Sequence, residues 1–143
     1  MPNGSYLTTG AALGSGRLSR ARRRHSRVLI GAGLVLLPWL GYLAGTLPPG
    51  EAAAWVTLDA MEAVALLTAG SRLVRVDASH RAPAAAAAVL LLADACIDLA
   101  TAAPGPELAT AIAMAAVAEL PLAALCAALA TRTDRPRDGA HPR

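Results

Sequence analysis

Four apolar segments, each as long as a membrane-spanning helix, dominate this chain. They cover residues 28–47, 52–73, 82–103 and 108–129. A helix of about 20 residues rises ~1.5 Å per residue and therefore crosses the ~30 Å hydrocarbon core of a bilayer. Hydrophobic residues make up 55% of the 143-residue chain, a content typical of a protein that exposes apolar surface to lipid. The sequence predicts an all-α integral membrane protein, a four-helix bundle within residues 27–130.

The connections between the segments predict how the helices pair. Residues 47–51 and 103–107 form very short connections rich in proline and glycine, which favours tight turns. Each ends in a glutamate, placed where the dipole of the next helix favours an anion. We therefore expect two antiparallel hairpins, joined by a longer connection over residues 74–81.

The arginines predict the orientation of the bundle. They lie before the first segment, around the second connection and after the last segment, at Arg17, Arg20, Arg22, Arg23, Arg24, Arg27, Arg72, Arg75, Arg81, Arg132, Arg135, Arg137 and Arg143. The first and third connections contain none. Because positive charge is retained on the cytoplasmic side of a membrane, both termini are expected in the cytoplasm.

The two flanks of the apolar region lack apolar periodicity. Residues 1–26 predict a disordered basic cytoplasmic arm, and residues 131–143 a disordered cytoplasmic tail. The arginines of the arm set the topology and attract anionic lipid head groups. No aromatic residue is interleaved with them, so no nucleic-acid partner is expected.

Carboxylates within the apolar segments are the most informative polar residues. Asp59, Glu62, Asp94, Asp98 and Glu119 have no basic residue beside them in these segments. Each costs roughly 2.5 to 3.5 kcal/mol at the centre of a bilayer, and such residues usually face the interior of a bundle and serve a function. These five acids are therefore the candidate binding residues for a ligand or cation.

Their spacing places the acids in one region. Asp59 and Glu62 are three residues apart, and Asp94 and Asp98 are four apart, so each pair shares one helical face. Counting ~1.5 Å per residue from the outer helix ends predicts two layers. The outer layer holds Asp59 and Asp98, and the inner layer holds Glu62, Asp94 and Glu119.

No arginine within the segments neutralises these acids. Arg72 is ten residues beyond Glu62, or ~15 Å along the helix. Three solutions are open: some acids are protonated, a cation binds between them, or water enters from the outer face. No histidine lies within the four apolar segments, which disfavours a transition-metal centre, whereas oxygen ligands suit Ca²⁺, Mg²⁺ or Mn²⁺. Cys96 and Cys126 differ too much in depth to form a disulfide.

Small residues and one proline predict details of helix packing. Gly41 and Gly45 form a small-xxx-small pair in the first segment, and residues 84–88 are all alanine, so both sites favour close packing. Pro121 removes a backbone hydrogen bond two residues after Glu119. A kink with a freed carbonyl is expected on that turn.

Several short runs resemble a family of small membrane proteins. These are residues 37–39, 42–43 and 47–48, Trp55 with Asp59 and Glu62, residues 94–98 with 101–102, and residues 119–122. They resemble uncharacterised four-helix membrane proteins of actinobacteria, which carry Asp-Ala-Trp-Phe-Asp-like and Glu-Leu-Pro-Leu-like motifs in their third and fourth helices. Cys96 and Ile97 replace the aromatic pair. The resemblance implies the topology, the same acids and the bacterial plasma membrane, but no activity or cofactor.

Three functions are compatible with these residues. The acids could bind a proton, a cation or a cationic small ligand, as in a transporter, which often acts as a homo-oligomer. Alternatively, a carboxylic acid and a carboxylate could act as acid and base on a lipid or isoprenoid. In the third hypothesis the chain is a structural subunit whose acids pair with a basic membrane partner.

Overall fold

The computed structural model describes residues 9–132, all but a few of them helical. The elements are α1 (Thr9–Thr46), α2 (Pro49–Val74), a 3-10 turn η1 (Ala78–His80), α3 (Arg81–Thr101), α4 (Pro106–Met114), a π-helical turn η2 (Ala115–Glu119) and α5 (Leu120–Thr131). Since α4, η2 and α5 are continuous, the described chain has four helices long and apolar enough to span a membrane. The predicted all-α four-helix architecture is confirmed.

The outer surface of these helices is apolar. Val35, Val89 and Val117 are 70%, 67% and 79% exposed, and many further large apolar side chains point outward along all four segments. Water makes such a surface costly, whereas lipid tails are as apolar as the side chains. The surface therefore agrees with a multi-pass membrane protein.

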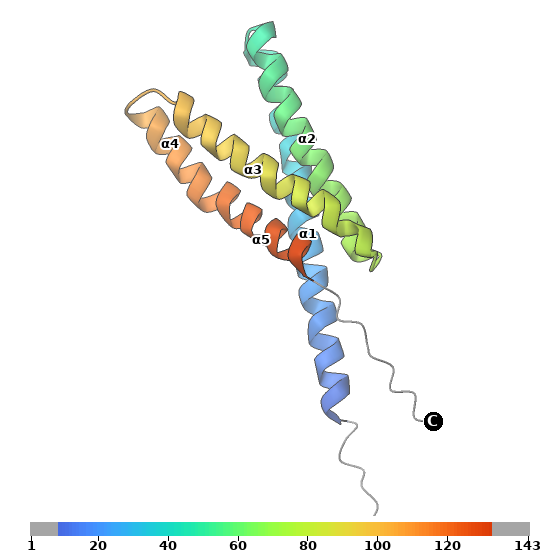
Figure 1. Cartoon of the computed structure of the whole chain (residues 1–143). Helices are drawn as coiled ribbons and strands as arrows, with labels where there is room; N and C mark the ends of the chain where they lie inside the picture. The colour runs from blue at the N-terminus through green and yellow to red at the C-terminus, as the bar shows by residue number, and fades with distance from the viewer. Residues whose placement is uncertain (1–8, 133–143) are drawn as a thin grey trace, which may run out of the picture.

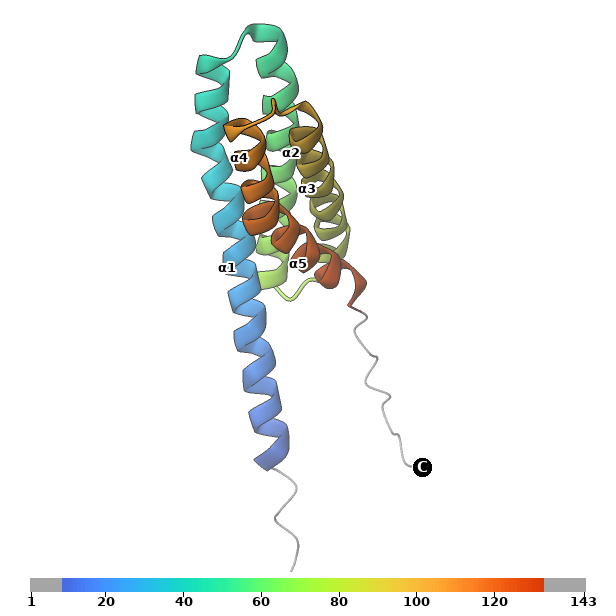
Figure 2. The same ribbon diagram turned by 90° about the vertical axis from the view of Figure 1, so that its left-hand side faces the viewer.

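The two hairpins diverge from one end of the bundle to the other. Helices α1 and α2 form one hairpin, and α3 pairs with the α4–α5 segment in the other (Figure 1). The hairpins lie close together at the end that carries the η1 connection and the end of α5, which we call the arginine end (Figures 1 and 2). Buried residues from all four helices meet toward this end, among them Leu29, Leu73, Ala84 and Leu129. The ends with the short turns are splayed apart, and this splay makes room for a cavity between the hairpins.

Two glycines allow α1 and α2 to pack closely. A Cβ added at Gly70 would lie 2.7 Å from Ile30 Cγ1, and one at Gly33 would lie 2.8 Å from Leu67 Cγ. Next to the first contact, the buried Ser26 hydroxyl donates to the Gly70 carbonyl over 2.9 Å. These contacts fix the two helices against each other near the arginine end.

The predicted packing role of the glycine pair at residues 41 and 45 is wrong. No atom lies within 4 Å of a Cβ built at either position. Both positions therefore lie where no other described residue approaches α1 closely. The alanine run of α3 behaves as predicted, because Ala84, Ala87 and Ala88 are all buried.

Helix α1 also begins earlier than predicted. The helix starts at Thr9, so residues 9–26 are helical rather than part of a disordered arm. Alanine, leucine and arginine are frequent here and have high helix propensity, and extending an existing helix avoids the cost of a new nucleus. The remaining predicted disorder, over residues 1–8 and 133–143, lies outside the described residues.

The C-terminal end of α2 has a residue in an unfavourable backbone conformation. Val76 has φ of 61°, and the amides of Val76 and Asp77 donate to the carbonyls of Leu73 and Arg72 over 3.4 and 3.1 Å. This is the Schellman pattern, in which glycine is the usual residue at the position of Val76. The Asp77 carboxylate then accepts from the Ser79 amide over 2.9 Å, at the start of η1. Interactions with the Ser79 side chain and then with its amide lower the Asp77 pKa.

Replacing Val76 by glycine should stabilise the protein. The left-handed conformation costs an L-residue about 1 to 2 kcal/mol, and the side chain is 65% exposed, so little packing is lost. After the entropy cost of glycine, roughly 0.5 to 1 kcal/mol, a net gain of up to ~1 kcal/mol is expected. Thermal unfolding in detergent measures it. Val76→Ala, which keeps the Cβ, is the control and should gain less; an unfolding temperature below wild type for Val76→Gly would contradict this explanation.

Candidate functional site

A cavity of about 870 Å³ lies between the two hairpins. All four helices line it, with α1 contributing Ala32, Val35, Leu36 and Trp39, and α2 contributing Trp55, Asp59, Glu62 and Leu66. From α3 come Leu91, Asp94, Asp98 and Thr101, with Ala102 just beyond the helix, and from the α4–α5 segment Glu107, Thr110, Ala111, Met114, Ala118, Glu119 and Leu122. The cavity thus occupies the space that the splay of the hairpins opens.

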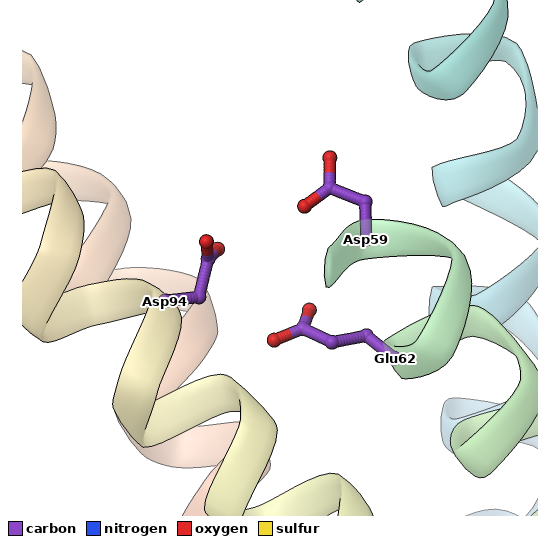
Figure 3. A group of neighbouring side chains, drawn as sticks. All are labelled: Asp59, Glu62 and Asp94. Carbon is purple, nitrogen blue, oxygen red and sulfur yellow. The ribbon is translucent and has the colours of Figure 1, made fainter. Parts of the chain in front are cut away.

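All five predicted acids line this cavity. Asp59, Glu62 and Glu119 are buried, with only 5%, 2% and 8% of their surfaces exposed. Asp94 and Asp98 on α3 are half-buried. Figure 3 shows Asp59 and Glu62 on α2 reaching toward Asp94 on α3 across the gap between the hairpins. The structure therefore gathers the five acids into one buried acidic cluster.

The carboxylates of the cluster form two overlapping groups of three. Oxygen atoms of Asp59, Glu62 and Asp94 lie within 4.8 Å of one another, and so do oxygens of Asp94, Asp98 and Glu119. Asp94 belongs to both groups. Each group combines acids from both predicted layers, and Asp94 on α3 links the α2 acids to Glu119. Depth along a helix axis says nothing about how closely two helices approach.

Two carboxylate oxygens of the cluster are buried without a hydrogen-bond partner. They are Glu62 Oε1 and Glu119 Oε2. No arginine or histidine is among the cavity-lining residues that the structure describes. Buried polar atoms normally have a partner, and a buried charge without one is costly. A bound proton or cation would give these carboxylates the partner that the described residues do not provide.

The backbone around Glu119 is irregular. Residues 115–119 form a π-helical turn, in which the Leu120 amide donates to the Ala115 carbonyl, five residues back. Pro121 follows and has no amide hydrogen to donate, and the chain changes direction between α4 and α5 (Figure 2). The predicted irregularity is thus present as a π turn. Such turns are frequent at functional sites, and this one ends on the acid that enters the cluster.

Aromatic residues form part of the cavity wall. Trp39 and Trp55, the only tryptophans of the chain, both line it. The Trp39 ring stacks on Tyr42 with centroids 5.5 Å apart. From the sequence, Trp55 fits a membrane-interface anchor and Trp39 has no evident role. Both lie on helices that line the cavity, but the direction in which their side chains face could not be predicted.

Three further polar residues line the cavity without having been among the predicted site residues. They are Thr101, Glu107 and Thr110. Thr101 continues the helical face of Asp94 and Asp98, and Glu107 lies in the first turn of α4, where the helix dipole alone explains an acid. Helical spacing could have identified Glu107 and Thr110. Together with Met114 and Ala118 they are spaced three or four residues apart, which places all four on one face of the fourth segment.

The cysteines are not part of the cavity lining. Cys96 is exposed and Cys126 is buried, and both are free. The absence of a disulfide between them agrees with their predicted difference in depth.

Comparison with known proteins adds no family or relative. No protein-family model matches the chain, and no curated protein or solved structure is significantly similar to it. The chemistry of the cavity is therefore the basis for assigning a function.

Proposed function

We propose that this protein binds a hydrophobic organic cation in the acid-lined cavity. The observation that carries the proposal is the unpartnered Glu62 Oε1, an atom of a side chain that is only 2% exposed and that lines a large cavity. A cation placed there gives the carboxylate the partner that the protein does not supply. The arrangement combines negative charge with a predominantly apolar wall.

The cavity walls favour an organic cation over a small hydrated one. A volume of 870 Å³ lies in the upper part of the range of ~300 to 1,000 Å³ that is typical of small-molecule sites. Leu36, Leu66 and Leu91 supply apolar surface, and the indole rings of Trp39 and Trp55 can attract a cation through their π faces. A ligand of this kind has a positive centre and a bulky apolar body.

Tetraphenylphosphonium is a suitable probe, because it has both properties. Since both tryptophans line the cavity, saturable binding to the full chain in non-ionic detergent should change the tryptophan fluorescence. Tetraphenylborate has the same shape and the opposite charge, and it should not produce this change. Equal binding of the two ions would show an apolar cavity without charge selectivity and would overturn the proposal.

Binding of the cation should release protons. An empty cluster without a basic counter-charge holds protons to limit repulsion between its carboxylates, and a bound cation takes over that role. In weakly buffered detergent solution, adding tetraphenylphosphonium should acidify the medium in proportion to the sites filled, and a pH indicator measures this. Saturable binding without acidification would rule out exchange of the ligand for protons.

Transport is the extension of this exchange that we propose. With both termini in the cytoplasm, the cavity lies nearer the outer face, and a cation and a proton that compete for the same carboxylates can be moved in opposite directions. Proteoliposomes loaded with the probe should release it faster when an inward proton gradient is applied. If the rate of release is the same with and without the proton gradient, the proposed function is binding without proton-coupled transport.

A divalent metal is the second candidate ligand, favoured by the two groups of three oxygens. Ca²⁺ binds oxygen at ~2.3 to 2.6 Å, so two of its ligand atoms can be up to ~5 Å apart. The 4.8 Å limit within each group meets this condition. Calcium alone should then raise the unfolding temperature and compete with tetraphenylphosphonium. Competition would show that both cations use the same acids, stabilisation by calcium without binding of tetraphenylphosphonium would favour the metal, and no effect of calcium would leave the organic cation.

A further inference from the structure

A second pocket, separate from the acid-lined cavity, lies at the arginine end between α1 and the end of α2. Its volume is about 360 Å³, and its lining consists of Arg22, Arg23, Ser26, Arg27, Ile30, Leu73, Val74 and Val76. No acid is among these lining residues, in the part of the chain that the structure describes. The lining is therefore basic on the α1 side and apolar on the α2 side.

Several polar groups beside the pocket already have hydrogen-bond partners within the protein. The Ser26 hydroxyl is bound to the Gly70 carbonyl over 2.9 Å and is the inner wall of the pocket rather than a free donor. The carbonyls of Arg72 and Leu73 at the end of α2 accept from the amides of Asp77 and Val76. Asp77, the nearest acid in sequence, is bound to the Ser79 amide.

Its depth along the bundle matches a membrane interface. Arg22, Arg23 and Arg27 precede the apolar run that begins at Val28 in α1, and Leu73 and Val74 end the candidate span Pro49–Val74. Val74 and Val76 are 57% and 65% exposed beside the arginines. Because Ser26 and Ile30 lie against Gly70 in this antiparallel pair, Ile30 is nearer the middle of the bundle than Arg22, Arg23 and Arg27.

We infer that this pocket binds the phosphate group of an anionic phospholipid, with Arg23 and Arg27 contacting the phosphate and the deeper Ile30 contacting the upper acyl chain. Arginine is suited to this role because its planar fork donates two parallel hydrogen bonds to phosphate oxygens. A basic pocket between membrane helices on the cytoplasmic side is the usual form of a lipid head-group site. A free phosphate would use the arginines but would leave the apolar wall unused.

The test measures binding of lipid to the full chain in non-ionic detergent. Phosphatidylglycerol should raise the unfolding temperature and bind in native mass spectra, whereas phosphatidylcholine and inorganic phosphate at equal ionic strength should do neither. The double variant Arg23→Gln/Arg27→Gln should bind phosphatidylglycerol about 100-fold more weakly, because it loses two hydrogen bonds between charged groups, each worth roughly 1.5 kcal/mol.

The matched control is Arg20→Gln/Arg24→Gln. It removes the same charge at the same spacing from the same helix, but neither residue lines the pocket. Arg20 and Arg24 are exposed, and interactions of exposed charges are weak, so the phosphatidylglycerol affinity should stay within about threefold of wild type. Equal weakening in the two double variants would show attraction by surface charge alone and overturn the site, and so would equal stabilisation by inorganic phosphate. Neither result depends on the acid-lined cavity, which lies toward the other end of the bundle.

Discussion

Asp94→Asn should abolish most of the affinity for tetraphenylphosphonium. Asp94 is the one acid that belongs to both oxygen groups, so its replacement removes a charge from each while keeping the shape of the side chain. Loss of one member of a buried charge pair costs about 2 kcal/mol or more, which is roughly 30-fold or more in Kd. Fluorescence titration of the tryptophans in wild type and variant measures the change.

Glu51→Gln is the control for this variant. Glu51 is an exposed acid in the first turn of α2 and does not line the cavity. It removes the same formal charge from the splayed end of the bundle, so a long-range effect of net charge should appear in both variants. If Asp94→Asn and Glu51→Gln lower the affinity equally, or if neither does, the acidic cluster is not the binding site.

Gly70→Leu should strongly destabilise the fold. A Cβ at this position already lies 2.7 Å from Ile30 Cγ1 and 3.2 Å from Ile30 N, so a leucine side chain must push α1 away from α2. Overpacking of this kind typically costs about 1 to 3 kcal/mol, and separation of the helices also endangers the buried Ser26 hydrogen bond to the Gly70 carbonyl. We expect a loss of ~3 kcal/mol or more, seen as a lower unfolding temperature in detergent.

Gly41→Leu provides the comparison, because nothing lies within 4 Å of a Cβ at that site. It makes the same chemical change in a membrane helix of the same bundle and should leave the unfolding temperature close to that of wild type. Equal destabilisation by the two leucines would mean that the close approach of α1 and α2 at Gly70 is not a main source of stability.

The positions of the helices and the burial of the acids could be predicted from the sequence. Each depends on the free energy of placing one segment or one side chain in a bilayer. An apolar run of about 20 residues has few alternatives to a membrane helix, and a carboxylate in such a run must face the protein interior. Asp59, Glu62 and Glu119 are accordingly buried in the structure. Neither inference required knowledge of how the helices cross.

The incorrect or missing predictions concern the approach of one helix to another. Gly41 and Gly33 are both glycines in α1, but only the second is close to α2, and their sequence context does not separate them. The association of Asp94 with two groups of acids depends on the angle between the hairpins. Similarly, the left-handed conformation of Val76 could not be predicted, because β-branched residues such as valine rarely adopt a positive φ.

The splay of the two hairpins divides the work of recognition between different helices. All five acids come from α2, α3 and η2, whereas α1 adds to the cavity only Ala32, Val35, Leu36 and Trp39. The segments α2, α3 and η2 thus determine which ligand charge the cavity accepts. Helix α1 helps to limit the size and shape of the ligand. Substitutions along α1 offer a route by which such a protein could change its range of ligands during evolution while its acids stay intact.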